Sequence, residues 1–437
     1  MSASIEPLAP SRSWPTLPGW GWGLAALLLG LLSLRAAGYD NEGDLRVYYD
    51  VVGRVPQGLD LYQLREGPDP ERPTGYIYPP LFALAFLPLT ALPFPWVRGL
   101  WFFLMGLLAV RSVLVGLGLA SARGLGRGWV ERAGLALGLA CALRFVWSDL
   151  GHGQVNVLVA WLAIEGIAQA ERGRDRRAGA LLALATLVKL TPALLIAGYL
   201  VAGRWRLAAW AGAVGMAGLA APALVFGPAL TLDQLLRFGL EVTPWNAQAH
   251  AYVGNNAALT SLVQRLLVGV ADPGQTPRPL LASLDPAAVR RACTALSGAV
   301  LLATLVASTR LRGVRRPALL LAAVPLISPV AWKPHLAGLL LPLLVAGRAL
   351  SVPGPGRWLA GAGAALLLVS GRGFVGRWAA DQASVWGITT LGLVLLAAGL
   401  ARRPSAEGPA AEGALPDSGV APAGALDPGD ARADPLE

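Results

Sequence analysis

The stretch that decides the fold is residues 96–119, WVRGLWFFLMGLLAVRSVLVGLGL, in which Arg98 and Arg111 are the only charged residues. A helix needs about 20 apolar residues to cross the hydrocarbon of a bilayer, and this stretch is long enough. Similar runs recur along the 437 residues, which are 55% hydrophobic and 14% charged, with a mean hydropathy of +0.54. Because a soluble globular protein has about 25% charged residues, the composition excludes a soluble enzyme and a disordered protein.

The apolar runs are continuous and rich in Leu and Ala, which predicts an all-α polytopic membrane protein rather than a β-barrel. The two cysteines, Cys141 and Cys293, lie inside such runs, so a disulfide scaffold is excluded as well. We expect about 12 transmembrane helices. Single spans are predicted at 18–37, 96–119, 132–148, 154–170, 206–226, 288–309, 317–330, 334–350, 356–371 and 385–401, and two crossings within 177–202.

The arginines predict which side of the membrane each loop faces. Clusters at 123–132, 172–177, 204–206, 310–316 and 402–403 are typical of the cytoplasmic side. The loop 38–78, which holds eight acids and four arginines, is predicted to face outward. This assignment requires one net crossing in 78–119, so the proline-rich segment 79–93 is interpreted as a juxtamembrane or re-entrant helix. Both termini are then cytoplasmic in a multi-pass plasma-membrane protein of the cell envelope.

The domain organisation follows from the same pattern. Residues 17–403 are predicted to form one transmembrane catalytic domain, with external segments at 38–95 and 227–287. Residues 20–37 are too long for the apolar region of a signal peptide and lack a small-residue cleavage site, so they are read as an uncleaved first helix. Residues 1–16 and the tail 404–437, which has seven acids and one base, are predicted to be disordered.

Polar residues gather on the predicted outer side, and polar groups at membrane depth tend to mark functional cavities. Asp44, just beyond the first helix, is a candidate general base if it lies near a hydroxyl, or else a capping or solvated carboxylate. Four tyrosines of the same loop could stack on sugar rings or form an interfacial aromatic belt. These are Tyr48, Tyr62, Tyr76 and Tyr78.

Three further polar breaks lie between predicted spans. The turn at 151–156 offers His152, Gln154 and Asn156 to hydroxyls or a phosphate, or it is a glycine turn with Asn156 as helix cap. Two residues apart on a helix, Gln154 and Asn156 are not expected to share a face. Lys189 could bind a phosphate or extend to the lipid headgroups. The third break, which contains Trp332, Lys333 and His335, is either part of the polar site or a plain proline-rich turn. The remaining outward candidates are His250, Asn255 and Asn256.

The sequence gives no cofactor motif: there is no nucleotide-binding glycine loop after a strand and no HExxH helix. Asp40, Glu42 and Asp44 could hold a hard cation through oxygen ligands, but their spacing is not diagnostic, and no metal is expected.

Together, the order and spacing of these pieces resemble glycosyltransferase family 87, the polyprenyl-phosphate-mannose-dependent mannosyltransferases of the GT-C superfamily. The resemblance spans about residues 20–400. It is carried by Asp44-Leu-Arg-Val-Tyr48, Tyr78-Pro-Pro-Leu81, Gly153-Gln-Val-Asn156, Lys189-Leu-Thr-Pro192 and the turn from Ser328 to His335.

The resemblance implies a GT-C glycosyltransferase fold and an inverting transfer of a hexose, usually mannose, from a polyprenyl phosphate to an acceptor hydroxyl on the outer face. It implies that Asp44 is the general base, with Lys189, His335 or Lys333 donating to the leaving phosphate, and that no metal is needed. The acceptor would be a glycolipid or glycan. The chain departs from the family where Lys333-Pro-His335 replaces two histidines and where 254–256 only loosely matches an Asn-rich segment.

Two other functions are compatible with a polytopic membrane protein. A transporter or flippase for a lipid-linked sugar would favour internal repeats and a midplane site. No repeat relates the two halves of the sequence, and the polar residues gather at one face, which favours the enzyme. A non-catalytic scaffold would leave that gathering unexplained.

Overall fold

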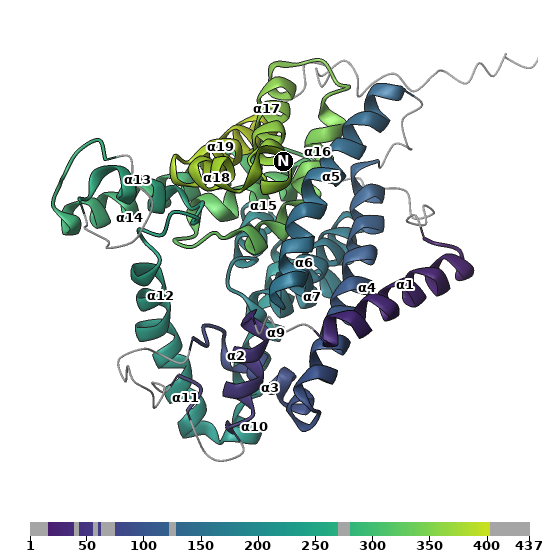
Figure 1. Cartoon of the computed structure of the whole chain (residues 1–437), viewed down its shortest axis with the longest axis vertical. Helices are drawn as coiled ribbons and strands as arrows, with labels where there is room; N and C mark the ends of the chain where they lie inside the picture. The colour runs from purple at the N-terminus through teal and green to yellow at the C-terminus, as the bar shows by residue number, and fades with distance from the viewer. Residues whose placement is uncertain are drawn as a thin grey trace, which may run out of the picture.

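A computed structural model of the chain describes residues 16–38, 43–55, 60–62, 75–121, 128–269 and 280–402. Within these ranges every regular element is helical, which confirms the predicted all-α class (Figure 1). The first half contains α1 (Gly19–Ala37), α2 (Gly43–Val52), α3 (Pro80–Phe86), η2 (Leu87–Ala91), α4 (Phe94–Ala120), α5 (Trp129–His152), α6 (Asn156–Glu171), α7 (Asp175–Val188), α8 (Ala193–Val201) and α9 (Trp205–Ala220).

The second half begins with a series of short helices and ends in a helical bundle. Its elements are α10 (Ala223–Phe226), α11 (Pro228–Arg237), η3 (Phe238–Val242), α12 (Thr243–Ala249), α13 (Leu259–Leu267), α14 (Pro286–Thr309), α15 (Arg315–Ile327), η4 (Lys333–Leu339), α16 (Leu340–Ala349), α17 (Pro355–Val369), α18 (Arg372–Val385) and α19 (Ile388–Ala401).

In the described part of the chain, five helical stretches are long and apolar enough to cross a membrane, as expected of a multi-pass protein. They are α1, α4, α5, α9 with α10 (Trp205–Phe226), and α14, each at a predicted span. The pair α17 and α18 adds a sixth if the two count as one span, although they are bent by 89°. The other predicted spans are shorter: the 14 residues of α7 cover about 21 Å, less than the ~30 Å of hydrocarbon. The count of twelve crossings and the sidedness of the loops therefore stay predictions.

From the sequence, residues 177–202 could form either one kinked helix or two short helices. The structure has two helices there. Lys189 lies between α7 and α8 in an extended conformation, φ −153° and ψ 128°, and Pro192 immediately precedes α8. The segment 79–93 forms the short pair α3 and η2. The sequence did not predict α18, because this helix contains polar residues and therefore does not form an apolar run.

Within the described residues, two of the three apolar clusters contain most of the buried core. The larger surrounds α16, whose residues Leu340–Gly347 are all buried, because the run LLPLLVAG is apolar on every side. The second joins α2 and α3 to the nearby ends of α4 and α5, through side chains such as Tyr48, Phe82 and Trp101. This second cluster fixes α2 beside the turn between α5 and α6, where the candidate site lies.

Candidate functional site

The turn between α5 and α6 is built around Gly153 and a buried carboxylate, Asp149. Gly153 ends α5 in the left-handed conformation, φ +64°, which glycine adopts without steric cost. Asp149 is fully buried and accepts hydrogen bonds from the backbone N–H groups of Asn156 and Val157 at 3.2 and 3.1 Å. It thereby satisfies the free donors at the start of α6. The predicted capping of this helix is thus performed by Asp149, not by the Asn156 side chain.

α2 contacts this turn closely enough to bring Asp44 to it. A β-carbon added to Gly43 would lie 2.5 Å from the His152 carbonyl oxygen, and one added to Gly153 would lie 2.7 Å from the Leu45 β-carbon. Both glycines have positive φ, so the conformation and the contact each favour glycine here. As a result the side-chain amide of Gln154 donates a hydrogen bond to a carboxylate oxygen of Asp44.

A continuous chain of hydrogen bonds runs from Asp44 to Lys189. The amide of Asn156 donates to the Gln154 side-chain oxygen at 2.6 Å, and the Lys189 ammonium donates to the Asn156 side-chain oxygen at 2.7 Å. Gln154 and Asn156 were not expected to share a face of a helix, yet their side chains are hydrogen-bonded to each other. The contact is possible because α6 begins only at Asn156, so Gln154 lies outside the helix and turns toward it.

The surroundings of Asp44 act in opposite directions on the pKa of its carboxyl group. Burial raises the pKa of the Asp44 carboxyl above its ordinary value. The hydrogen bond from Gln154 and the nearby charges of His152 and Lys189 act in the opposite direction on that pKa. Asp44 lies in α2, outside the candidate spans.

Lys189 lies on the wall of a cavity of about 490 Å³ between α7, α8, α14 and α15. His335, Tyr78 and Ser328 contribute polar groups to its lining, and Leu190, Leu194 and Leu301 are among the apolar side chains. A second, smaller cavity of about 50 Å³ also touches Lys189, Asn156 and His335. The geometry suits a ligand with a long apolar part and an anionic group near Lys189.

The turn that carries His335 is held by Asn256. Its amide nitrogen donates to the carbonyls of His250 and Pro329, both at 3.0 Å, and its oxygen accepts from the backbone N–H of Ala331 at 2.8 Å. The sequence placed Asn255 among the substrate-binding residues, but Asn255 is exposed while its neighbour Asn256 is fully buried. Nothing in the pattern Gly254-Asn-Asn256 distinguished the two.

Two aromatic contacts complete this turn. The Trp332 ring lies between His250, at 4.7 Å between centroids, and His335, at 6.0 Å. Its indole N–H is buried and has no hydrogen-bond partner among the described residues. Lys333 does not line the cavity of Lys189; the charged groups nearest to it in electrostatic effect are Arg144, Arg372 and Asp381.

The tyrosines of segment 48–78 lie in the core. Tyr48, Tyr62 and Tyr78 are all buried, and the Tyr48 hydroxyl donates to that of Tyr78 at 2.9 Å. The Tyr62 hydroxyl donates to the Tyr78 carbonyl at 2.7 Å. Sugar stacking and an interfacial belt both require exposed rings, so neither interpretation holds for Tyr48 and Tyr62. Tyr78 alone of the three borders the large cavity.

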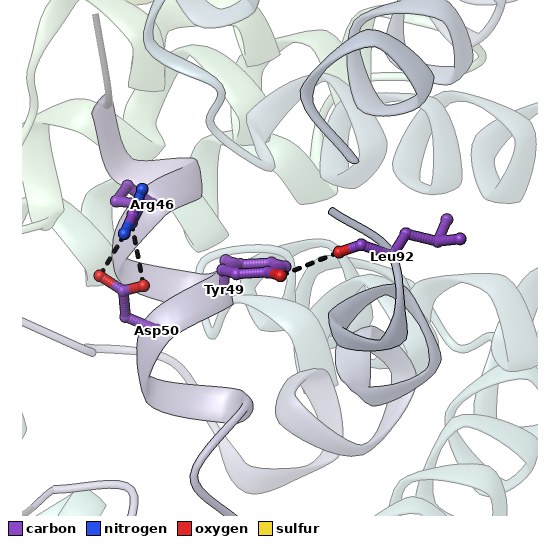
Figure 2. Close-up of polar contacts among 4 residues, drawn as sticks. All are labelled: Arg46, Tyr49, Asp50 and Leu92. Carbon is purple, nitrogen blue, oxygen red and sulfur yellow. Dashed lines mark hydrogen bonds and ion pairs between the residues drawn. The ribbon is translucent and has the colours of Figure 1, made fainter. Parts of the chain in front are cut away.

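The opposite face of α2 carries a separate set of contacts (Figure 2). Arg46 donates to both oxygens of Asp50 at 2.9 and 3.0 Å, and the Tyr49 hydroxyl donates to the Leu92 carbonyl at 2.9 Å. The Tyr49 bond attaches α2 to the segment before α4, the Arg46–Asp50 pair lies within α2, and neither involves Asp44.

Among the described residues, no group of three His, Cys, Asp or Glu side chains could hold a metal ion. Asp40 and Glu42, which the sequence grouped with Asp44, lie outside the described residues, as do most of 1–16 and all of the tail 404–437.

Comparison with known proteins adds three findings. Residues 76–329, more than half of the chain, match glycosyltransferase family 87. Over 198 residues the chain is 31% identical to a polyprenol-phosphate-mannose-dependent alpha-(1-2)-phosphatidylinositol pentamannoside mannosyltransferase of Mycolicibacterium smegmatis. That match covers 43% of this chain and 44% of the length of the relative. A crystal structure of ArnT from Cupriavidus metallidurans bound to undecaprenyl phosphate aligns over 88% of this chain and 77% of its own, with 14% identity and a TM-score of 0.32.

Proposed function

The chain belongs to glycosyltransferase family 87, and on that premise we propose that it transfers a hexose, mannose in the first instance, from a polyprenyl phosphate to an acceptor hydroxyl on the outer face of the membrane. The observation that carries the proposal is the hydrogen-bonded chain from the Asp44 carboxylate to the Lys189 ammonium. One end of it offers a base and the other a cation beside a large, mostly apolar cavity.

The reaction requires one proton acceptor and one anion binder. Asp44 takes the proton of the acceptor hydroxyl as its oxygen attacks the anomeric carbon of the sugar. The bond from that carbon to the phosphate oxygen breaks, and the electron pair leaves with the polyprenyl phosphate. A single displacement of this kind inverts the anomeric configuration. Gln154 holds the Asp44 carboxylate in position through its amide, so it is a positioning residue.

The leaving phosphate gains negative charge as the bond breaks, so a cation aimed at it stabilises the transition state. The Lys189 ammonium donates to Asn156 and has further hydrogens to offer to the phosphate. His335 lies on the same cavity wall, and Trp332 beside it has an indole N–H without a partner in the described part of the chain. The apolar side chains of α7, α8, α14 and α15 suit the polyprenyl chain.

The name of the Mycolicibacterium smegmatis relative supports the choice of donor, since that protein depends on polyprenol-phosphate-mannose. The GT-C architecture, the outward-facing site and the cytoplasmic termini belong to the same proposal. Loss of the base should cost about 10²–10⁴ in rate, because it acts mainly in the transition state.

The test is the transfer of labelled mannose from polyprenyl-phosphate-mannose in isolated membranes, with their own lipids and glycans as acceptors. Asp44→Asn should lose activity by that factor at an unchanged protein level. Asp50→Asn is the matched control: it removes a carboxylate from the same helix, on the face shown in Figure 2, and should transfer at close to the wild-type rate. An active Asp44→Asn variant would overturn the assignment of the base.

Two further measurements test the rest of the proposal. Nuclear magnetic resonance of the product should give an anomeric configuration opposite to that of the donor, and retention would contradict a single displacement. Polyprenyl-phosphate-glucose should compete poorly with the mannose donor. If the labelled lipid instead crossed the membrane with no sugar transferred, the transporter function would be favoured.

A further inference from the structure

Asp149 makes a contact that its capping of α6 does not require. Besides the two backbone N–H groups, its carboxylate accepts a hydrogen bond from the side-chain amide of Asn156 at 2.8 Å. The backbone carbonyl of Asp149 also accepts from the backbone N–H of Gln154 at 3.1 Å. Both polar parts of this fully buried residue are thus joined to the hydrogen-bonded chain that runs from Asp44 to Lys189.

The groups at the ends of the chain fix which way each amide points. An ammonium can only donate, so Asn156 presents its oxygen to Lys189. An ionised carboxylate can only accept, so Asn156 presents its NH2 group to Asp149. The same NH2 group donates to the Gln154 side-chain oxygen at 2.6 Å, which directs the Gln154 NH2 group to Asp44. The donors of the chain therefore point from Lys189 toward Asp44.

Of the two groups that orient Asn156, Lys189 is the one that a ligand reaches. Lys189 borders both cavities of the site, and a phosphate bound there competes with Asn156 for the hydrogens of the ammonium. Asp149 lines neither cavity and is 0% exposed, so its bond to Asn156 is closed to the ligand. The direction of the Asn156 amide in the donor-bound enzyme therefore depends on Asp149.

We propose that Asp149 is a positioning residue for the reaction: it fixes the direction of the Asn156 amide and, through Asn156 and Gln154, the hydrogen bond that holds the Asp44 carboxylate. The role requires a hydrogen-bond acceptor at Asp149 and no proton transfer to it. This inference rests on the proposed function for the role of Asp44 as the base, but the coupling between the two carboxylates can be measured without any sugar transfer.

Three variants separate this role from the capping of α6. Asp149→Leu removes the side-chain acceptor altogether. Asp149→Asn keeps one oxygen, which serves both donors of Asn156 and leaves the Val157 N–H without its bond. Asp285→Ala is the matched control for a lost cap, because Asp285 caps α14 by accepting from the backbone N–H of Ala288 at 2.7 Å. Where Asp149→Leu does not accumulate, Asp149→Ser replaces it, since the serine hydroxyl lies one bond short of the aspartate oxygens.

The first experiment titrates Asp44 in the purified full-length protein with polyprenyl phosphate bound, a lipid that has no sugar to transfer. Infrared spectra are recorded against pH, and the Asp44 carboxyl band is the one missing from Asp44→Asn. The bond from Gln154 lowers the pKa of Asp44, so Asp149→Leu should let the protonated band persist to a pH roughly one unit higher. Asp149→Asn and Asp285→Ala should titrate like the wild type.

A double variant tests the route of the coupling. In a Gln154→Leu background Asp149→Leu should add no further shift to the Asp44 band, because the link through Gln154 is already gone. The other titratable groups that act on Asp44 are left in place in all of these variants. They are His152, Lys189, Tyr48 and Tyr78.

The second experiment measures sugar transfer from polyprenyl-phosphate-mannose. Asp149→Leu should lower kcat by roughly 10- to 100-fold, as expected for a lost hydrogen bond to a charged group, and should move the acidic limb of the pH profile to higher pH. KM for the donor should stay within about twofold. Asp149→Asn should remain within a few-fold of the wild type with the limb unmoved, and Asp285→Ala should lower only the thermal midpoint.

Each outcome decides a separate point. If Asp149→Leu moves neither the Asp44 band nor the limb, Asp149 is only a helix cap and the inference is wrong. If Asp149→Asn loses as much activity as Asp44→Asn, the Asp149 carboxylate takes part in the chemistry, and positioning is again wrong. A shift that persists in the Gln154→Leu background would show that the coupling bypasses the chain, which also overturns the inference. If the wild type transfers no sugar, the proposed function fails, while the band shift still decides whether Asp149 positions Asp44.

Discussion

The side-chain amide of Gln154 donates to the carboxylate of Asp44 across 110 positions of the sequence. Gly43 and Gly153 allow α2 and the α5–α6 turn to approach closely: a β-carbon at Gly43 would collide with the His152 carbonyl oxygen, and one at Gly153 with the Leu45 β-carbon. Asp44, in the first turn of α2, is thereby joined to the turn that follows α5, a candidate membrane span. The site is thus held together by main-chain contact as well as by its polar groups.

We expect the bond from Gln154 to influence the pH dependence of the proposed activity. The amide stabilises the charged form of Asp44 and so lowers a pKa that burial raises. A general base works deprotonated, so kcat/KM should fall as the pH drops through the pKa of Asp44. Gln154→Leu removes the stabilising bond, raises that pKa further and should move the acidic limb of the profile to higher pH. The measurement is kcat/KM against pH for both proteins, with Asp44→Asn as the reference without a base.

The direction of this pH shift shows whether Gln154 acts through the Asp44 carboxylate. A Gln154→Leu enzyme whose activity falls equally at every pH, with the limb unmoved, would show that Gln154 does not act through the Asp44 carboxylate.

Gly153 and Gly151 form a matched pair for testing the close approach of α2. Gly153→Ala places a β-carbon on Leu45 and forces alanine into the left-handed region, at about 1–2 kcal/mol for the conformation alone. We expect a lower thermal midpoint and a large loss of activity, because α2 and Asp44 are displaced. Gly151→Ala meets no atom within 4 Å and should be close to wild type in both. Similar effects of the two substitutions would exclude the contact as the cause.

Much of the fold was readable from the sequence because membrane helices must be long and apolar. The candidate spans α1, α4, α5 and α14 all lie where an apolar run predicted them. α18 was missed because it is polar, and the break at Lys189 was left open because a proline can either kink a helix or separate two. In both places tertiary packing decides the conformation.

The candidate site was predicted less completely, and each miss has a physical reason. Residue type alone indicated four candidate site residues, and the structure connects all four by hydrogen bonds. These are Asp44, Gln154, Asn156 and Lys189. Asp149 was overlooked as a single acid within an apolar span, although an isolated carboxylate at that depth is itself a signal of function or of capping. The tyrosines were assigned to the surface because burial in a short external segment depends on α3 and α4, which the local pattern does not contain.

The two lysines of the site region should differ in their effect on the reaction. Lys189 lines the large cavity and continues the hydrogen-bonded chain, whereas Lys333 does not line that cavity. Lys189→Met should lower kcat by about 10²–10³, as expected for loss of a group that stabilises developing charge. Lys333→Met should remain within a few-fold of the wild type. The comparison uses kcat at saturating donor, and equal losses would remove Lys189 from its proposed role.

The last prediction separates a core tyrosine from a sugar-binding one. Tyr48 is 1% exposed and packs edge-on against Tyr78, Phe82 and Phe86, with centroids 5.1 to 5.9 Å apart. Tyr48→Phe keeps the ring and loses only the hydroxyl bond to Tyr78, at about 1 kcal/mol, so KM for both substrates should be unchanged. Tyr48→Ala empties the centre of the cluster, at about 3–5 kcal/mol, and should lower the yield of folded protein.

Tyr49→Phe, which removes a hydroxyl bond on the opposite face of α2, is the control for a small loss of stability. Thermal midpoints and KM values are measured for the three variants. The assignment of Tyr48 to the core is wrong if Tyr48→Phe raises KM for either substrate tenfold while its thermal midpoint equals that of Tyr49→Phe. A hydroxyl that contributes to substrate binding must be reached by the substrate, and the buried Tyr48 of this structure is closed to it.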